Sequence, residues 1–300
     1  MRGRFLEFDD LKITGRTAVY ALIGDPVDHS LSPTIQNAAF RSIGLEAIYI
    51  PFRVEPFGLK AAVRGLRVLG VRGFNVTAPH KIKTIKYLDE VEAAAAEVGS
   101  VNTVTNLDGN LVGSNTDGTG ALQALEEAGA RVEGASVLLF GAGGAGRAIA
   151  HALAERNCAI TLVNRTTSKA QRLAKRLHRK FGIAAKHYSL STQNLRALVD
   201  SADLIVNASS MGMEGTDDLP VSRKWLREDH WVLDIVYKPL RTKLLQNAAI
   251  VGARTINGLD MLVNQGACSF SLWTKKKAPM LEMRRAIAQQ LPAIEHASSS

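Results

Sequence analysis

Four polar clusters near the amino-terminal end carry side chains that suit the binding of a polyhydroxylated acid. They are Ser30-Leu31-Ser32-Pro33, Asn75-Val76-Thr77-Ala78-Pro79-His80-Lys81, Asn102 and Asn115-Thr116-Asp117. Each cluster lies at the end of an expected strand or the start of an expected helix, where open α/β sheets bind their ligands. Each residue also has an ordinary explanation, because Ser32 and Asp117 are good helix N-caps and Lys81 suits an exposed helix face. Together the clusters supply hydroxyls, amides, one ammonium and one carboxylate.

A glycine-rich loop in the middle of the chain predicts a dinucleotide site. Gly141-Ala142-Gly143-Gly144-Ala145-Gly146 fits the pattern G-x-G-x-x-G. The apolar run 137–140 precedes it and a helical pattern at 147–156 follows, as the pattern requires. The glycines allow a tight turn, close approach of the pyrophosphate and close helix–strand packing, and the phosphates bind the free N–H groups of the helix. A glycine-rich turn without a ligand is the alternative.

The residues after the next expected strand favour NADP over NAD. An NAD site places Asp or Glu there, on the ribose hydroxyls. This chain instead has Asn164-Arg165-Thr166, with Lys169 one helical turn later. Arg165 could bind a 2′-phosphate bidentately and stack on adenine. Cations with no role beyond the surface are the alternative interpretation.

Short apolar runs and amphipathic segments alternate along the chain. The expected strands are 18–23, 47–52, 73–76, 101–105, 111–114, 137–140, 160–163, 184–188, 204–207 and 231–235. Helices are expected at 32–43, with Ser32 as N-cap, at 56–69, 82–88, 91–98, 118–128, 147–156, 261–273 and 279–290. Asp108-Gly109 indicates a hairpin between two of the strands. The regular alternation of the second half predicts a parallel sheet covered on both faces.

Length and composition exclude several classes of protein. At about 150 residues per domain, 300 residues predict two domains. Hydrophobic residues at 46% and charged residues at 22% are typical of a globular protein. No apolar stretch reaches the roughly 18 residues of a membrane span. Residues 1–16 lack a signal-peptide pattern, and Cys158 and Cys268 match no redox or metal spacing. We therefore expect a cytoplasmic protein without a metal ion.

The net charge of +9 is concentrated in one segment. Eight cations and no acid lie between Asn164 and His187. A nucleic-acid-binding face would need interleaved aromatic residues or a known motif, and this segment offers only Phe181, with Tyr188 nearby. The apolar positions of this segment have helical spacing, which predicts a surface helix with a solvated basic face that attracts small anions.

The motifs of the chain, taken in order, resemble those of the shikimate dehydrogenase family. They include Gly24-Asp25-Pro26 with His29 to Pro33, Asn75 to Lys81, Asn115 to Gly118, the glycine loop and Asn164-Arg165-Thr166. Asn207-Ala208-Ser209 with Gly212-Met213, Asp234 to Thr242, and Asn257 to Leu262 with Gln265 complete the series. The resemblance runs from about residue 18 to residue 273 and is more specific than the glycine loop alone.

This resemblance implies NADPH-dependent reduction of 3-dehydroshikimate to shikimate, a step of aromatic amino-acid biosynthesis. It implies an α/β protein with two open, twisted, mostly parallel sheets and helices on both faces. Residues 1–116 and 258–300 would form a substrate-binding catalytic domain, and residues 117–257 an inserted Rossmann domain that binds NADP. The expected partner is the small-molecule substrate, and the chain would be a monomer or a homodimer.

The resemblance also implies roles for individual residues. Lys81 would be the catalytic acid and base, with Asp117 as its partner. The other substrate-binding residues would be Ser30 and Ser32 on the carboxylate, and Thr77, Asn102, Tyr237 and Gln265 on the hydroxyls and ring, together with Asp117. The coenzyme would contact Gly141, Ala142, Gly143, Gly144, Ala145, Asn164, Arg165, Thr166 and Lys169, with Ile235 and Gly258 at its nicotinamide end.

Two departures and two competing functions remain open at this point. The family usually has His where Gln36 stands, a position away from the expected ligand contacts. It often has Arg where Lys169 stands, and because lysine offers a point charge in place of a fork, the preference for NADP would be less strict here. A quinate/shikimate dehydrogenase that uses NAD or both coenzymes is the nearest alternative; Ser32 and the missing acid after the second Rossmann strand point away from it. A catalytically silent nucleotide-binding sensor is the other, and the presence of both Lys81 and Asp117 argues against it.

Overall fold

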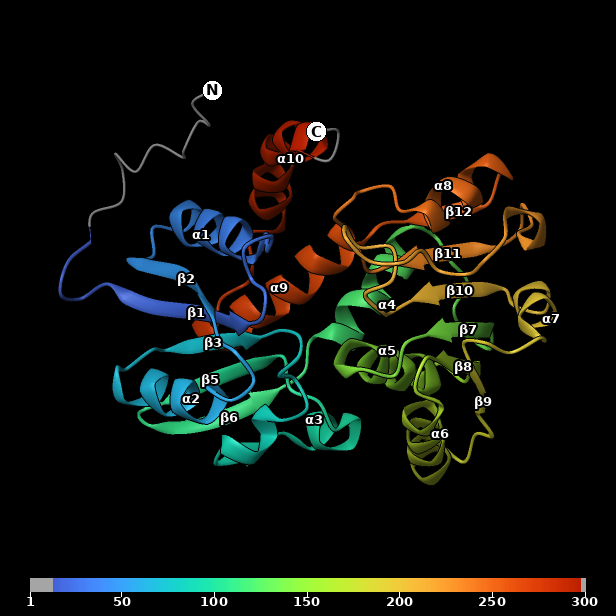
Figure 1. Cartoon of the computed structure of the whole chain (residues 1–300). Coiled ribbons are helices and arrows are strands. Elements are labelled where there is room, and N and C mark those ends of the chain that lie inside the picture. The colour runs from blue at the N-terminus through green and yellow to red at the C-terminus, as the bar shows by residue number, and fades with distance from the viewer. Residues whose placement is uncertain (1–12, 298–300) are drawn as a thin grey trace.

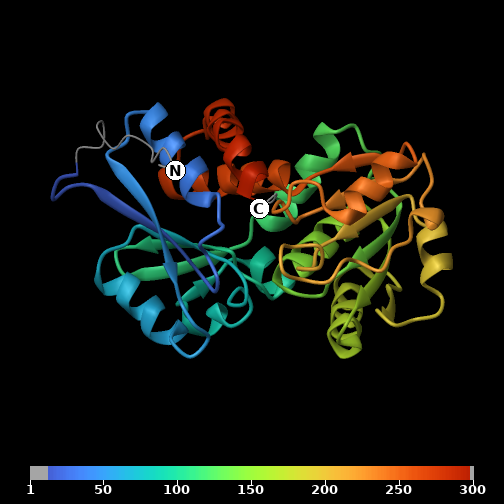
Figure 2. The same cartoon turned by 45° about the horizontal axis from the view of Figure 1, so that its top comes forward.

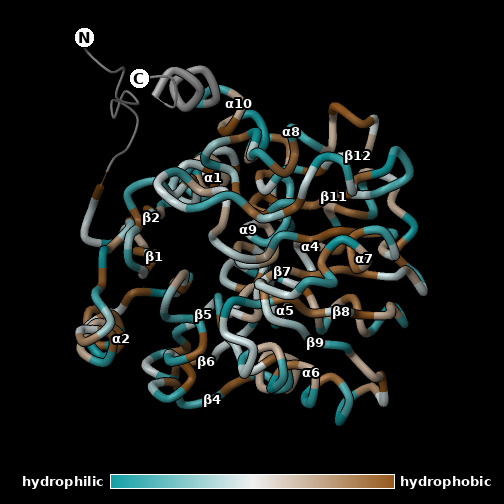
Figure 3. Tube along the Cα trace, turned by 45° about the vertical axis from the view of Figure 1, so that its right-hand side comes forward, coloured by the Kyte–Doolittle hydropathy of each residue, from teal (hydrophilic) through white to brown (hydrophobic). Residues whose placement is uncertain are grey.

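The computed structural model describes residues 13–297, which form two six-stranded sheets side by side, each covered by helices (Figure 1). Most of the segment 1–16, in which a signal-peptide pattern was not expected, lies outside these residues. Hydrophobic residues follow much of the strands, while many outer loops are hydrophilic (Figure 3). The expected class, α/β with two mostly parallel sheets, is confirmed.

The first sheet has the order β2-β1-β3-β5-β6-β4. Its strands are β1 (Ala18–Gly24), β2 (Ala47–Arg53), β3 (Gly73–Val76), β4 (Glu90–Val91), β5 (Thr103–Leu107) and β6 (Asn110–Ser114). β1 pairs in parallel with β2 and β3, whereas β5 runs antiparallel to β3 and β6. The expected hairpin is confirmed: Asp108 and Gly109 have φ of 51° and 96° at its turn, as a type I′ turn requires.

Two expected helices of the first half differ from the structure. The segment 82–88 contains only a 3₁₀ turn at Thr84–Tyr87, and the helix expected from residue 91 begins later, as α3 (Ala93–Val98). Glu90 and Val91 instead pair in parallel with β6 as a short edge strand. A free sheet edge can override a helical pattern because the backbone pairing is available only in the folded chain.

The carboxyl-terminal helices complete the core of the first sheet. α9 (Gly258–Thr274) and α10 (Met280–Ala297) pack with α1 (Ser32–Ser42) on one face, and α2 (Leu59–Val68) covers the other. Trp273 of α9 stacks 5.1 Å from Tyr20 of β1, and its indole nitrogen donates to the Val104 carbonyl at 3.0 Å. Phe270 lies 5.6 Å from Phe40 of α1. Buried aromatic area of this kind ties the end of the chain to its beginning.

The second sheet is fully parallel, with the order β12-β11-β10-β7-β8-β9. Its strands are β7 (Ser136–Phe140), β8 (Ala159–Asn164), β9 (Lys186–Ser189), β10 (Leu204–Asn207), β11 (Trp231–Asp234) and β12 (Arg254–Ile256). Counted from β7 this is the order 3-2-1-4-5-6 of dinucleotide-binding sheets, whose ligands bind where the order reverses, between β7 and β10. β12 is a strand that the sequence did not predict.

Helices cover both faces of the second sheet. α4 (Asp117–Glu127), α5 (Gly144–Glu155) and α6 (Thr167–Phe181) contribute to the core on one face, and α7 (Leu195–Asp200) and α8 (Lys243–Ile250) to the core on the other. α4 and α9 pack against each other between the two sheets (Figures 1 and 2). Their approach is close, because a methyl group on Gly120 would lie 2.7 Å from the Gln265 side chain.

The basic helix α6 is not simply a solvated surface. Arg176 donates from Nη1 to the carbonyls of Ala96 and Glu97, at 3.0 and 2.6 Å, and Lys180 pairs with the Glu97 carboxylate. Both partners belong to α3, in the other half of the chain. The expected solvated basic face is therefore wrong in part, because Arg176 of α6 binds the free carbonyl end of α3, which carries partial negative charge.

Candidate active site

A cavity of about 580 Å³ lies between the two sheets, where β1 and β3 end on one side and β7, β8 and β10 end on the other. Of the site residues expected from the sequence, all but Ala142 line it. Its lining also includes residues for which the sequence predicted no role: His29, Asn75, Met213, Met261 and Leu262. The spacing of Gly258, Met261, Leu262 and Gln265 is the signal that could have found two of these, because it marks one helix face.

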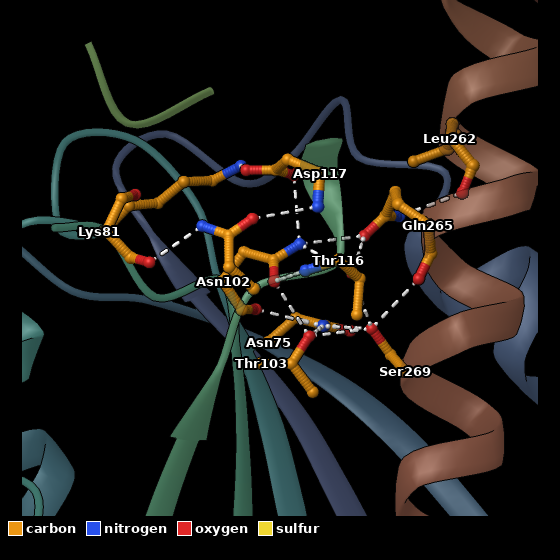
Figure 4. A network of polar contacts seen from close by, with 11 residues as sticks. Asn75, Lys81, Asn102, Thr103, Thr116, Asp117, Leu262, Gln265 and Ser269 are labelled. Carbon is orange, nitrogen blue, oxygen red and sulfur yellow. Dashed lines mark hydrogen bonds and ion pairs between the residues drawn. The ribbon is translucent and has the colours of Figure 1, made fainter. Parts of the chain in front are cut away.

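Lys81 and Asp117 form an ion pair inside this cavity (Figure 4). Lys81 Nζ lies 2.7 Å from Asp117 Oδ2, and the side chains are 16% and 3% exposed. Asn102 Nδ2 donates to the other carboxylate oxygen at 2.9 Å. Both oxygens of Asp117 are therefore oriented, while Lys81 still reaches the cavity with protons to donate.

The alternative role of Asp117 as an N-cap is wrong. Thr116 occupies the N-cap position, and Asp117 is the first residue of α4, where a negative charge is favoured by the helix dipole. Its carboxylate makes no capping hydrogen bond and instead binds Lys81 and Asn102.

A buried amide network holds this pair in place. Asn102 Oδ1 accepts from the Thr116 N–H at 2.8 Å, and Asn102 Nδ2 lies 3.3 Å from Gln265 Oε1. Below it, Asn75 Nδ2 donates to Ser269 Oγ at 3.0 Å (Figure 4). Asn75 Oδ1 accepts from the Tyr49 hydroxyl at 2.9 Å. Strands of the first sheet, α4 and α9 are thus cross-linked beneath the cavity. Such satisfied buried networks fix side-chain positions.

Ser30 and Ser32 lie at one end of the cavity, at the start of α1. The expected N-cap role of Ser32 is wrong: Leu31 is the N-cap residue, and no side chain caps the helix. Burial raises the pKa of Tyr237, and hydrogen bonding to Ser30 partly opposes this shift. The hydroxyl of Ser32 is likewise hydrogen-bonded to Tyr49, whose pKa burial raises well above its usual value. Ser30 Oγ also accepts the N–H of Ser32, the first residue of α1, at 3.3 Å. Both serines therefore lie beside polar groups of the cavity, and Ser30 contacts the start of the helix as well.

Replacing Ser32 with alanine should weaken substrate binding without weakening the helix. A lost hydrogen bond to a carboxylate costs roughly 1.5–3 kcal/mol, so KM for shikimate should rise about 10- to 100-fold. The midpoint of thermal unfolding should change little, because no capping bond is lost. Ser42→Ala, at the far end of the same helix, is the matched control and should leave KM unchanged. A lowered midpoint with an unchanged KM would show that Ser32 serves the fold alone.

The glycine loop has the shape that a pyrophosphate requires. Gly141 has φ of +103°, and a methyl group there would lie 2.6 Å from the Ala208 carbonyl oxygen. A methyl group on Gly146 would lie 2.2 Å from the Gly141 carbonyl oxygen. A methyl group on Gly143, by contrast, would have no atom of another residue within 4 Å. Ala142 is buried and donates its N–H to Asn164 Oδ1 at 3.0 Å. This hydrogen bond from Ala142 to Asn164 fixes the position of the loop. The space beside Gly143 is open.

Arg165, Thr166 and Lys169 lie on the wall of the cavity beyond the loop and are exposed. Neither cation is in an ion pair with any residue between 13 and 290. Two free positive charges and a hydroxyl therefore surround this end of the cavity. Such a set suits a phosphate monoester.

The opposite end of the coenzyme region lies between β11 and α9. A methyl group on Gly258 would stand 2.3 Å from the Ile235 carbonyl oxygen, so α9 begins in contact with the end of β11. The preceding residue, Asp234, is fully buried and accepts hydrogen bonds from Asn207 Nδ2, the Val236 N–H and the Thr242 hydroxyl at 2.9, 3.0 and 2.7 Å. Burial raises the pKa of Asp234 from 3.8 to about 6, against the opposing effect of these bonds.

Ionisation of Asp234 should lower the stability of the fold as the pH rises. Below pH 3.8 the carboxyl is neutral in both the folded and unfolded states, so it contributes no difference. Above about pH 6 it is ionised in both, and the raised folded-state pKa lowers the free energy of unfolding by about 3 kcal/mol. Chemical denaturation of the Asp234→Asn variant should lack this fall. Parallel curves for both proteins between pH 4 and pH 7 would contradict it.

Other polar groups bear less on the site. Gln36, which stands where the family usually has a histidine, is buried and donates to the Gly266 carbonyl at 2.9 Å. Cys158 and Cys268 form no disulfide. Burial raises the pKa of the Cys158 thiol to about 11. Among residues 13–290, whose side chains the structure describes, no cluster of His, Cys, Asp and Glu could hold a metal ion. Nor does any helix of that part of the chain have the length and hydropathy to cross a membrane.

Comparison with known proteins matches almost the whole chain. Residues 22–104 match the family model of the shikimate dehydrogenase substrate binding domain, 123–214 that of shikimate/quinate 5-dehydrogenase, and 258–288 that of the shikimate 5′-dehydrogenase C-terminal domain. The chain is 45% identical over 285 residues to the shikimate dehydrogenase (NADP(+)) of Moorella thermoacetica, covering 94% of this chain and 97% of that protein. It is 48% identical over 273 residues to that of Pyrococcus abyssi, covering 91% and 98%.

A solved structure agrees. A crystal structure of a shikimate dehydrogenase in complex with NADP⁺ superposes with a TM-score of 0.86 at 44% identity, over 93% of this chain and 98% of that one. Identity at this level over nearly complete chains, together with the three matched domains, places the chain in the shikimate dehydrogenase family.

Proposed function

We propose that the chain catalyses the NADP-dependent, reversible reduction of 3-dehydroshikimate to shikimate. The observation that carries this proposal is the Lys81–Asp117 ion pair, at 2.7 Å, inside the cavity between the two sheets. Polar side chains for a hydroxylated acid lie on one side of the pair, and the glycine loop lies on the other. The relatives named above support the same reaction and coenzyme.

The residues of the chain divide the work as follows. NADPH, when bound, supplies a hydride to the carbonyl carbon of the substrate. The Lys81 ammonium stabilises the negative charge that develops on the carbonyl oxygen and donates a proton to it. Asp117 holds Lys81 in position, and Asn102 holds Asp117. In the reverse direction a neutral Lys81 accepts the proton from the hydroxyl of shikimate.

Substrate recognition falls to the polar side chains around this pair. We assign the substrate carboxylate to the hydroxyls of Ser30 and Ser32, which can donate charge-assisted hydrogen bonds. The ring and its hydroxyl groups are assigned to Thr77, Asn102, Asp117, Tyr237 and Gln265, all of which line the cavity.

The chain fits NADP(H) on three observations. Gly143 leaves open space where the pyrophosphate would lie against the start of α5. Arg165, Thr166 and Lys169 would hold the 2′-phosphate, and Ile235 with Gly258 would border the nicotinamide. The buried Ala142 would act through the shape of the loop rather than by contact.

We also propose the division of labour between the halves. Residues 1–116 and 258–300 would form the catalytic domain, and 117–257 the coenzyme-binding domain. The packing of α9 and α10 on α1 supports this division, although α4 contacts both halves. We propose a cytoplasmic location, which the two free cysteines suit. We also propose that the protein is a monomer or a homodimer, and light scattering during gel filtration measures this oligomeric state.

Initial rates with shikimate and quinate, each with NADP⁺ and NAD⁺, test the proposed function. The value of kcat/KM should be highest for shikimate with NADP⁺. Asn164 and Arg165 stand where NAD-specific enzymes carry an acid, so NAD⁺ should be the poorer coenzyme. A higher kcat/KM with quinate, or equal use of NAD⁺, would favour a quinate/shikimate dehydrogenase instead. Absence of turnover with every pair would refute both functions.

A further inference from the structure

One glycine of the coenzyme loop is not explained by the dinucleotide pattern. G-x-G-x-x-G places its glycines at Gly141, Gly143 and Gly146, and Gly144 occupies a position that any residue could fill. Its backbone does not demand glycine either, because it lies in the first turn of α5 and not among the glycines with positive φ. Alanine would favour the helix more than glycine does.

The reason for glycine here lies in the other half of the chain. A methyl group on Gly144 would lie 2.7 Å from Cβ and 3.0 Å from Cδ of Lys81, and 3.0 Å from Ser100 Oγ. Distances below 3.0 Å between carbon atoms are strongly repulsive. Since Cβ of Lys81 is fixed by its backbone, a side chain at Gly144 would displace either Lys81 or the coenzyme loop.

Lys81 is therefore held from three sides. Its ammonium binds Asp117 at 2.7 Å, its carbonyl accepts the Val101 N–H at 2.8 Å, and its side-chain stem rests against Gly144. Ser100, beside the same contact, is fully buried, and its hydroxyl has no hydrogen-bond partner among the described residues. The Ser100 hydroxyl therefore makes no hydrogen bond that could hold Lys81 in place if the contact with Gly144 changed. The position of the lysine thus depends directly on the position of the loop.

We propose that Gly144 is a positioning residue for Lys81, so that the coenzyme loop sets where the acid–base group stands. This rests on the proposed function, which makes Lys81 the proton donor. The loop would then serve the reaction twice: Gly143 leaves room for the coenzyme, while Gly144 seats the lysine that acts on the substrate. Small displacements of a catalytic group lower the rate steeply.

Gly144→Ala and Gly143→Ala form a matched pair that tests this assignment. Both add one methyl group to the same loop, but only the methyl at 144 meets the protein. Gly144→Ala should lower kcat at least tenfold at saturating coenzyme, while the Kd for NADPH, measured by its fluorescence, rises less than in Gly143→Ala. Gly143→Ala should raise that Kd at least tenfold.

A readout without turnover separates this inference from the proposed function. The coenzyme-free proteins are treated with trinitrobenzenesulfonate, and labelling of Lys81 is compared with that of the exposed Lys60 by peptide mass spectrometry. The ratio should rise at least threefold in Gly144→Ala, because Lys81 is displaced from Asp117, and stay unchanged in Gly143→Ala. An unchanged ratio together with an unchanged kcat overturns the inference. Wild-type protein that does not oxidise shikimate refutes the proposed function, whereas the labelling still decides the contact.

A double substitution covers the case in which Gly144→Ala destabilises the chain. The fall in the midpoint of thermal unfolding should be smaller when Gly144→Ala is introduced into a Lys81→Gly background, because the opposing Cβ is then absent. Equal falls in both backgrounds would show that the two residues are uncoupled and would overturn the assignment.

Discussion

Replacing Lys81 with alanine should lower kcat for shikimate oxidation by about 100-fold or more, while KM for shikimate changes little. The reason is that proton transfer and charge stabilisation by Lys81 act mainly in the transition state. The geometry supports this role, because Lys81 is the cation that pairs with the buried Asp117 inside the cavity. Steady-state kinetics at saturating NADP⁺ measure both parameters.

Lys81→Met is the matched variant for this prediction. Methionine keeps an unbranched stem against Gly144 and removes the ammonium, so its kcat should fall as far as that of alanine. Binding of NADPH, followed by fluorescence, should persist in both variants because the pyrophosphate loop is intact. Near-normal kcat in Lys81→Met would remove Lys81 from the mechanism. A fall in kcat with alanine alone would indicate a packing role.

Replacing Arg165 with alanine should narrow the preference for NADP⁺ over NAD⁺ by one to two orders of magnitude. Arg165 lines the cavity, is exposed and has no ion-pair partner among the described residues. Its guanidinium can bind a phosphate bidentately and stack on adenine, so its loss should be felt only where a 2′-phosphate is present. The measurement is kcat/KM with each coenzyme.

Lys169→Ala provides the comparison within the same site. As an exposed point charge, Lys169 should contribute less than Arg165, and its contribution should shrink more as the salt concentration rises. Both variants are therefore measured at two ionic strengths. Equal losses with NADP⁺ and NAD⁺ would show that these residues serve the fold or the shared pyrophosphate, and the assignment of the 2′-phosphate site would fail.

Local patterns were sufficient for most of the second sheet. The run at 204–207 and the strand before the glycine loop were predicted within a residue, and Asp108-Gly109 correctly predicted the hairpin. These features depend on neighbours two to four residues apart and on backbone conformations that few residue types allow. The coenzyme loop belongs to the same class, because its glycines at 141 and 146 are required by its own turn and helix.

Contacts between distant segments were decided by the tertiary structure. The sequence offered Ser32 and Asp117 as helix caps, and only the fold shows that neither side chain caps a helix. β12 and the short strand β4 form because a neighbouring sheet edge is available to them. Part of the basic face of α6 binds the end of α3, 80 residues away along the chain. Such contacts depend on where whole elements dock, which no window of sequence contains.

In the candidate site, too, the sequence predicted the residue types, and the tertiary structure decided which of them meet. From the sequence alone came the chemistry: the residue types that suit a hydroxylated acid, the phosphate loop and the cations after β8. Residues 81 and 117 meet at 2.7 Å only because β3 ends and α4 begins at one cavity, and Gln265 joins them because α9 returns from the end of the chain. The contact between Gly144 and Lys81 likewise appears only in the folded chain. Strand register and helix docking set these distances, and both arise from packing of the complete chain rather than from any local pattern.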